Sequence, residues 1–220
     1  MHALDHVKIR KYFYKNSNSS NELVILTPVR TIIDKFKNSD KYEMTGQTEG
    51  WWSLCTFKGM ASLASFDVMY FSPGLFVVDA LKTINPLKTK NVILLGLCGS
   101  LSPKYKVGDI FVPDKYALNF SILKTKYEIY PALHKSEKAI ATVPYMSMDK
   151  KDYHRMLELG ITAVDMESYF LYKWGEDNKI KVKSILVVSD SPLIKPFYVS
   201  DSRTYKVINE ALGTIVNNYI

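Results

Sequence analysis

The sequence predicts an α/β fold in three layers, a single domain with helices on both faces of a central, mixed, largely parallel twisted sheet. Three short runs, ELVILT (22–27), NVILL (91–95) and ILVV (185–188), are apolar at successive positions. Such runs are typical of strands covered on both faces. Segments with helical apolar spacing separate them along the chain, and this alternation of strands and helices favours a parallel sheet.

The stretch 161–190 predicts a βαβ unit. A short β-branched run ends at Asp165 and Glu167, an amphipathic helix follows, and a second apolar strand ends at Asp190. Ligands of open α/β sheets bind beyond the carboxyl ends of the strands. One crossover helix returns the chain beside its start, so we expect Glu167 and Asp190 to face one crevice.

Periodicity and turn residues predict the other elements. Residues 1–20 are basic and polar, and we interpret them as an N-terminal arm or loop that packs on a neighbouring subunit. Further strands are expected at 51–57, 60–70, 109–112 and 138–143, helices at 29–36, 75–84, 149–159 and 203–219, and turns at 71–74 and 96–101.

Composition limits the classes of function. The 220 residues are 47% hydrophobic and 23% charged, which suits one soluble globular domain. No apolar run approaches the roughly 18 residues of a membrane span, and the first residues lack the apolar core of a signal peptide, so we expect a cytoplasmic protein. The net charge of +7 is dispersed and no nucleic-acid motif is present, so the basic surface favours anionic small molecules over nucleic acid or membrane.

Cys55 and Cys98 are the two cysteines of the chain. They cannot form a disulfide framework, and no Cys/His cluster has zinc spacing, so we expect two reduced, buried thiols and no metal. No cofactor is predicted.

Four short motifs occur in order: GLCGSL (96–101), KVGDI (106–110), VDMES (164–168) and VVSD (187–190). Together they resemble the nucleoside phosphorylase and nucleosidase superfamily, which includes purine nucleoside phosphorylase, uridine phosphorylase and methylthioadenosine nucleosidase. The resemblance covers the chain from about Val24 to its end. It implies a nucleoside phosphorylase-like fold and cleavage of an N-ribosidic bond, with a purine nucleoside as the expected substrate.

Such cleavage needs a proton donor near the departing base and hydrogen-bond acceptors around the ribose. Asp190 is the candidate acid for the purine N7, with a pKa raised by burial, and Ser189 is expected to orient it by a hydrogen bond. Arg203 matches an arginine that supports the acid in similar phosphorylases, and Lys195 is the alternative cation. Asp190 as a turn cap and Arg203 as a helix start are the structural alternatives.

Ribose and base contacts are assigned to a second group of residues. Glu167 suits the two ribose hydroxyls, since an ionised carboxylate accepts from both, although an acid is also favoured at a helix start. Met166 would pack on the sugar, whereas Asp165 is expected to point away. We expect the ligand to approach closely at Cys98 and Gly99. The resemblance implies that Tyr145 stacks on the base. The alternative is that Tyr145 is an aromatic residue of the core.

The acceptor of the ribosyl group remains open. Arg30, just past the first strand, resembles the phosphate-binding arginine of the superfamily's phosphorylases, or else caps a turn at the surface. Leu94 and Leu97 stand where matching phosphorylases carry an arginine and a serine, and the stretch 70–72 lacks their glycines. Phosphorolysis, with phosphate as co-substrate, is slightly favoured over hydrolysis of methylthioadenosine, adenosylhomocysteine or a nucleotide, and over a non-catalytic nucleoside-binding protein.

Members of the superfamily are usually dimers or hexamers whose sites borrow residues from a neighbour. The resemblance therefore implies a homo-oligomer and a role in purine salvage. His6 is the candidate for a residue contributed to a neighbouring site.

Overall fold

The computed structural model describes residues 5–15, 21–62, 64–118, 128–130, 138–144, 149–196, 199, 201–218 and 220. It divides into two compact, interleaved units. Unit 1 comprises residues 1–95, 170–183 and 216–220, and unit 2 comprises residues 96–169 and 184–215. Strands β5 (Asn91–Ser100) and β11 (Lys181–Asp190) each contribute residues to both units.

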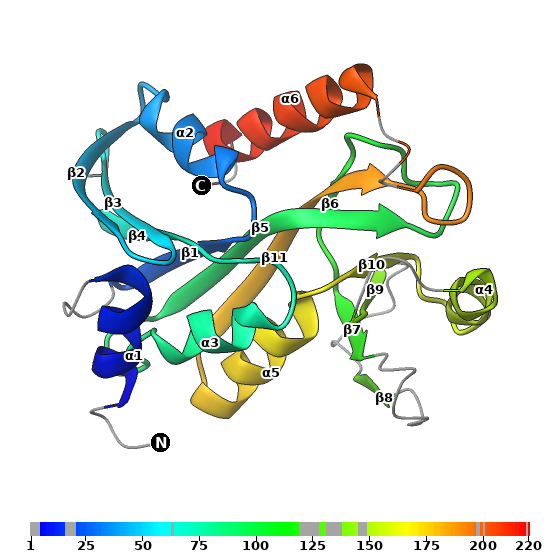
Figure 1. The fold of residues 1–220 in the computed structure, drawn as a ribbon, viewed down its shortest axis with the longest axis horizontal. Helices are drawn as coiled ribbons and strands as arrows, with labels where there is room; N and C mark the ends of the chain where they lie inside the picture. The colour runs from blue at the N-terminus through cyan, green and yellow to red at the C-terminus, as the bar shows by residue number, and fades with distance from the viewer. Residues whose placement is uncertain are drawn as a thin grey trace. The chain divides into compact units, whose positions relative to one another are not determined.

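The strands of unit 1 lie in the order β2-β3-β4-β1-β5 (Figure 1). β1 pairs in parallel with β4 and β5, and the β2-β3 and β3-β4 pairs are antiparallel. The bounds are β1 (Leu23–Thr27), β2 (Tyr42–Glu49), β3 (Ser53–Gly59) and β4 (Ser65–Tyr70). The predicted first strand and the 51–70 hairpin are confirmed. β2 was not predicted, because most of its side chains are exposed and carry no apolar alternation.

Helices lie on both faces of the unit 1 strands (Figure 1). α2 (Thr31–Lys37) lies on one face, where it buries Ile32, Ile33 and Phe36. On the other face lie α1 (Asp5–Tyr14), α3 (Phe76–Lys82) and the unit 1 part of α5 (Ser168–Asn178). Gly74, with φ +81°, makes the predicted turn before α3.

The interpretation of residues 1–20 as an arm or loop is wrong for residues 5–14, because they form α1, a helix that packs on its own chain. Residues 1–4 and 16–20 lie outside the described residues. Arg10 and Tyr14 are buried, and the Arg10 guanidinium lies 3.0 Å from the carboxylate of Asp67 on β4. Asp67 also accepts hydrogen bonds from Thr56 and Asn21. α1 is anchored by the buried ion pair of Arg10 with Asp67. A search for a stripe of apolar residues does not detect a helix that is held in this way. His6 lies within α1, but its side chain is outside the described residues.

The strands of unit 2 follow the order β5-β10-β9-β7-β8, while β11 pairs with β5 and β6. The β10-β9 and β7-β9 pairs are parallel, and β10-β5, β7-β8 and β11-β6 are antiparallel, so the sheet is mixed as predicted. The bounds are β6 (Ile110–Phe111), β7 (Lys115–Leu118), β8 (Glu128–Tyr130), β9 (Ala139–Thr142) and β10 (Ala163–Asp165).

Two helices complete unit 2. α4 (Lys150–Glu158) buries Tyr153 and Met156 in a core that includes Ala141 and Val164, and Gly160 with φ +80° follows its end. α6 (Ser202–Asn218) begins in unit 2 and ends in unit 1. Both helices were predicted within a residue or two of these bounds.

Two details of the sequence reading are corrected. The stretch 96–101 is not a turn, because β5 continues through Gly96 and Gly99 to Ser100 and pairs there with β10. The chain also does not return beside β10 after α5, since β10 and β11 both pair with β5. The two strands that end in acids, β10 and β11, therefore share β5 as a neighbour and are not paired with each other.

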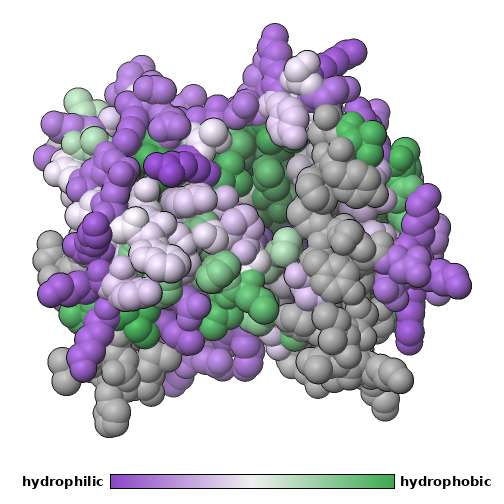
Figure 2. Space-filling model, viewed as in Figure 1, coloured by the Kyte–Doolittle hydropathy of each residue, from purple (hydrophilic) through white to green (hydrophobic). Residues whose placement is uncertain are grey.

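Hydrophilic residues cover much of the face shown in Figure 2, and hydrophobic residues reach the surface there in separate groups. Within the described residues, no helix combines the length and the apolar character needed to cross a bilayer.

Candidate active site

Three buried carboxylates follow or end strands of unit 2. Asp165 is the last residue of β10, Glu167 follows two residues later, and Asp190 is the last residue of β11. Their exposed fractions are 5%, 5% and 3%. Burial of three acids so close to strand ends indicates a constructed polar site, because isolated charges are seldom buried without compensation.

Cys98 on β5 lies between the ends of these two strands. β10 pairs with β5 at Gly99 and Ser100, one residue from Cys98. Burial raises the pKa of the Cys98 thiol well above its usual range, and the carboxylates of Asp165 and Asp190 raise it further. The pairing of β10 at Gly99 and the hydrogen bond from Ser189 of β11 to the Cys98 oxygen bring both strand ends to the same part of β5.

Asp190 is held by its neighbour in the chain. Ser189 Oγ lies 2.7 Å from Asp190 Oδ1 and 3.2 Å from the main-chain oxygen of Cys98, so its proton can be donated to either. The hydrogen bond predicted between Ser189 and Asp190 is thus present. It ties the orientation of the carboxylate to β5.

Asp165 performs a structural role at the start of α5. Its Oδ2 accepts the main-chain N–H of Ser168 over 2.8 Å, and its Oδ1 accepts the hydroxyl of Thr142 over 2.7 Å. Burial raises the pKa of Asp165 to about 6, against the lowering effect of these hydrogen bonds. The side chain therefore points to β9 and α5, as expected for a residue directed away from a ligand.

Glu167 immediately precedes α5. The Met166 main-chain N–H lies 3.3 Å from Glu167 Oε2, and Met166 is half-buried. Asp165 accepts the main-chain N–H of Ser168 at the start of α5. Glu167 lies at the same helix start, where the helix dipole favours an acid, so the structural alternative for Glu167 stays a prediction beside the ribose-binding one.

Gly99 is closely covered by the chain itself. A β-carbon at this position would lie 2.7 Å from Cγ of Pro192 and 3.3 Å from Cγ2 of Val164. The ring of Pro192, in the loop after Asp190, thus occupies the space that we had expected a ligand to enter. Gly99 lets the loop after β11 pack against β5.

The predicted cations of unit 2, Arg203 and Lys195, are exposed. Arg203 is exposed in the first turn of α6. Lys195 pairs with Asp201 over 3.1 Å, and Asp201 accepts the main-chain N–H of Thr204 at the start of α6. The Thr204 N–H and Lys195 lower the pKa of Asp201.

Arg30 belongs to unit 1, where it precedes α2. Its side chain is 68% exposed, and the distance from its Nη2 to Glu49 Oε1 is 4.0 Å. The guanidinium carbon lies 6.0 Å from the centre of the Tyr70 ring. The turn before it is fixed by Thr27, whose hydroxyl accepts the Val29 N–H over 3.0 Å. Tyr145 lies outside the described residues.

Sequence reasoning missed the hydroxyl groups around Asp165. Thr142 Oγ1 bonds Asp165 and accepts the main-chain N–H of Tyr169, while the hydroxyls of Ser168 and Ser184 lie 2.9 Å apart. Ser184 is the first unit 2 residue of β11. The available signal was a hydroxyl residue at the edge of each apolar run: Thr142 at the end of β9 and Ser184 just before the apolar run of β11. Within the described residues, no group of three His, Cys, Asp or Glu side chains could hold a metal ion.

The chain was compared with known proteins. No family model matches it. Purine nucleoside phosphorylase DeoD-type from Thermoanaerobacter sp. (strain X514) is 29% identical over 129 residues, covering 49% of this chain and 55% of the relative. The enzyme of the same name from Anoxybacillus flavithermus is 26% identical over 139 residues, covering 54% of this chain and 58% of the relative. The chain thus spans about half the length of these curated relatives.

Solved structures match over nearly the whole chain. The Helicobacter pylori nucleosidase with 5′-methylthioadenosine in its active site has a TM-score of 0.69 at 14% identity, covering 92% of this chain and all of that chain. The purine nucleoside phosphorylase of Toxoplasma gondii in complex with immucillin-H has a TM-score of 0.66 at 17% identity, covering 90% of each chain. The chain thus shares the fold of these nucleosidases and phosphorylases, and about half of its sequence is similar to that of purine nucleoside phosphorylases.

Proposed function

We propose that this protein is an enzyme that cleaves the N-ribosidic bond of a purine nucleoside and releases the free base. The observation that carries the proposal is the convergence of two strand ends on β5, with Asp190 at one and Glu167 just beyond the other, all buried. Crevices at the carboxyl ends of strands are the usual ligand sites of such sheets. The matched phosphorylases and nucleosidases support the same chemistry.

In the proposed reaction the carboxyl group of Asp190 donates its proton to N7 of the purine. The bond from the base nitrogen to C1′ then breaks with its electron pair leaving on the neutralised base, and positive charge develops on the ribose. Ser189 acts as a positioning residue through its hydrogen bond to Asp190. Glu167 accepts hydrogen bonds from the two ribose hydroxyls, and Met166 packs against the sugar.

Phosphate is the proposed acceptor, with Arg30 as its binding residue. The attacking phosphate oxygen forms a bond to C1′ and yields ribose 1-phosphate. The exposed contact between Arg30 and Glu49 is long at 4.0 Å, and such pairs contribute little, so the guanidinium can exchange Glu49 for an anion at small cost. Arg203 and Tyr145 remain proposed contacts to the acid and to the base.

Hydrolysis is the second candidate, and one observation favours it. Leu94 is fully buried in β5 at the place where similar phosphorylases carry an arginine, so no cation is available from that position. With water as the acceptor, the products are the base and free ribose or its 5′-substituted form, and no ribose 1-phosphate is formed. Methylthioadenosine, adenosylhomocysteine and a nucleotide are the substrates to compare.

One experiment separates these readings. A panel of nucleosides is incubated with and without phosphate, and free base and sugar product are measured by chromatography. Ribose 1-phosphate in proportion to base supports phosphorolysis, base release independent of phosphate supports hydrolysis, and no release from any nucleoside contradicts both. Arg30→Ala should raise the KM for phosphate and leave hydrolysis unchanged, with Lys35→Ala in the following helix α2 as control.

Asp190→Asn tests the role of the acid. It should reduce kcat by at least a hundredfold while nucleoside binding persists, since an amide cannot supply the proton. Asp40→Asn, an exposed position in unit 1, is the matched control. Circular dichroism checks the fold of each variant, and undiminished turnover in a folded Asp190→Asn protein would overturn the assignment.

Assembly, pathway and location are proposed from the superfamily alone. We propose a cytoplasmic homo-oligomer, a dimer or hexamer, that serves purine salvage. Light scattering during size-exclusion chromatography would measure the mass, and a monomer at micromolar concentration would contradict the proposal.

A further inference from the structure

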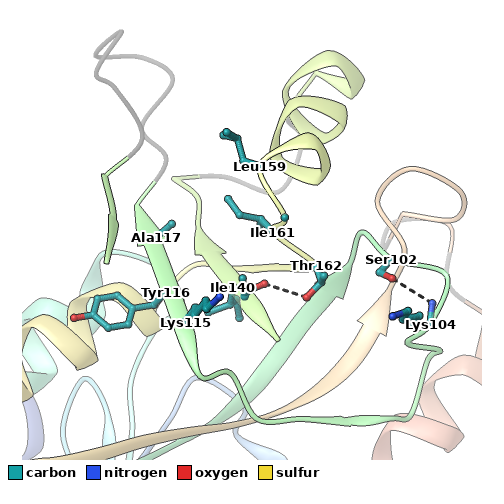
Figure 3. A pocket seen from close by; sticks show the side chains of 11 residues that line it. Ser102, Lys104, Lys115, Tyr116, Ala117, Ile140, Leu159, Ile161 and Thr162 are labelled. Carbon is teal, nitrogen blue, oxygen red and sulfur yellow. Dashed lines mark hydrogen bonds between the residues drawn. The ribbon is translucent and has the colours of Figure 1, made fainter. Parts of the chain in front are cut away.

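Unit 2 contains a cavity of about 420 Å³ that the proposed reaction does not use (Figure 3). It is lined by the first residues of β7 and β9, by the segment that joins α4 to β10, and by the loop after β5. Small-molecule sites usually measure about 300–1,000 Å³, so its size suits a small organic ligand.

The cavity lies at the opposite end of the strands from the buried carboxylates. β7, β9 and β10 are parallel, and the cavity is lined by Lys115 and Ala139, which are paired in register at the start of β7 and β9. Asp165 and Thr142 are paired at the other end of β10 and β9. A four-residue strand spans roughly 10 Å, so a ligand in the cavity does not touch the carboxylates.

The lining combines positive charge with apolar surface. Of the described residues that line it, Lys104 and Lys115 are cationic and none is acidic. Ile140 and Ile161 contribute apolar surface, and Leu159, 43% exposed, lies near Ile161 at the end of α4 (Figure 3). An apolar wall with a few charged groups is the usual composition of a specific small-molecule site.

Both sides of the cavity are fixed by hydrogen bonds. In the loop after β5, the buried hydroxyl of Ser100 donates to the main-chain oxygen of Ser102 over 2.7 Å, and the Lys104 N–H donates to Ser102 Oγ over 3.3 Å. On the opposite side, Thr162 Oγ1 donates to the Ala139 oxygen over 3.2 Å (Figure 3). A preformed lining reduces the entropy lost when a ligand binds.

We propose that this cavity binds a small organic anion, with its anionic group at Lys104 and Lys115 and its apolar body against Ile140 and Ile161. The ligand class is a phosphate or carboxylate attached to a flat apolar group. The site is separate from the nucleoside site and does not depend on the proposed function.

The test uses 1-naphthyl phosphate as the probe, with 1-naphthol and inorganic phosphate as the two half-ligands, in isothermal titration calorimetry of the full chain. We expect the probe to bind one per chain at least tenfold more tightly than either half-ligand. The double variant Lys104→Gln, Lys115→Gln should weaken its binding at least tenfold, and Lys206→Ala on α6 should not. No binding, or equal binding of neutral 1-naphthol, overturns the proposal.

A charge placed at the rim gives an independent check. Leu159→Glu should weaken probe binding at least tenfold relative to Leu159→Gln, which has the same shape without the charge. Equal affinities for the two variants contradict the assignment of the site. Asp190→Asn should leave probe binding unchanged, and a loss in this variant would mean that the probe occupies the proposed active site instead.

Discussion

The hydroxyl of Thr142 at the end of β9 donates a 2.7 Å hydrogen bond to the buried carboxylate of Asp165 at the end of β10. The same oxygen accepts the main-chain N–H of Tyr169 over 2.8 Å. One threonine therefore joins two neighbouring strand ends to the first turn of α5, directly beside Glu167. The position of the proposed ribose-binding carboxylate depends on this link.

Replacing Thr142 with valine should destabilise the protein by about 1–3 kcal/mol. Valine keeps the shape but leaves a buried acceptor and a main-chain donor without their partner. Urea unfolding measures the change. Thr162→Val is the matched control, because the Thr162 hydroxyl donates to the main-chain oxygen of Ala139 at a partly exposed site and its loss should cost under about 1 kcal/mol. Equal losses of unfolding free energy in the two variants would contradict the conclusion that the two hydrogen bonds of Thr142 hold the strand ends to α5.

The stability of the protein should fall as the pH rises from about 4 to 6. Burial raises the pKa of Asp165 from 3.8 to about 6, so in this window the folded chain keeps a proton that the unfolded chain releases. The resulting loss is on the order of 2–3 kcal/mol and is complete above the folded pKa.

Asp165→Asn removes this titration, so the difference in unfolding free energy between the two proteins should vary with pH only inside that window. Urea unfolding at pH 4, 5, 6 and 7 measures it. A difference that stays constant, or that favours the wild type at higher pH, would show that Asp165 is not held in its protonated form.

Neither cysteine should react with a thiol reagent in the folded protein. Cys55 and Cys98 are buried, and burial raises the pKa of both thiols, with the Asp165 and Asp190 carboxylates adding to the effect at Cys98. The reactive thiolate is therefore scarce as well as inaccessible. Labelling with a chromogenic disulfide should give two thiols per chain in denaturant and none within minutes in its absence. Rapid labelling of native Cys98 would mean that this part of β5 is open.

Gly99→Ala should destabilise the protein by about 1–3 kcal/mol, the usual cost of overpacking. The added methyl group would meet the rigid ring of Pro192 at 2.7 Å and force the loop after Asp190 away from β5. Gly46→Ala on β2 is the control, because its β-carbon would lie 3.8 Å from Thr56. If the proposed function is correct, Gly99→Ala should also lower kcat, because Asp190 precedes the displaced loop. Equal stability of the two variants would show that the loop yields without cost.

Sequence patterns predicted the parts of this fold whose side chains are apolar on both faces. β1 and the buried half of β11 are examples, since a run such as ILVV has few alternatives to a covered strand. The patterns failed where other forces decide. Gly96 and Gly99 indicated a turn, but both lie within β5, and Gly99 pairs there with Val164 of β10. β2 pairs with β3 although most of its side chains face solvent.

The carboxylates of the candidate site were predictable because short motifs surround them. Glu167 follows a buried strand, Asp190 ends one, and each lies in a recognisable sequence motif. Thr142 lies in no such motif, and its partner Asp165 is 23 positions away, so only the register of β9 with β10 brings the two together. The packing of Pro192 on Gly99 is likewise a contact between a loop and a strand far apart in the sequence, which sequence spacing does not encode.

The burial of Arg10 has a practical consequence for preparing the protein. A chain shortened to begin at Asn21 would lose the Arg10 guanidinium but keep the Asp67 carboxylate. Asp67 would retain the hydrogen bonds from the hydroxyl of Thr56 and the side-chain amide of Asn21, beside the new terminal amino group of Asn21. Removing one member of a buried ion pair commonly costs about 3–5 kcal/mol. Trimming the polar beginning of the chain to improve crystals would therefore remove a counter-ion of the sheet.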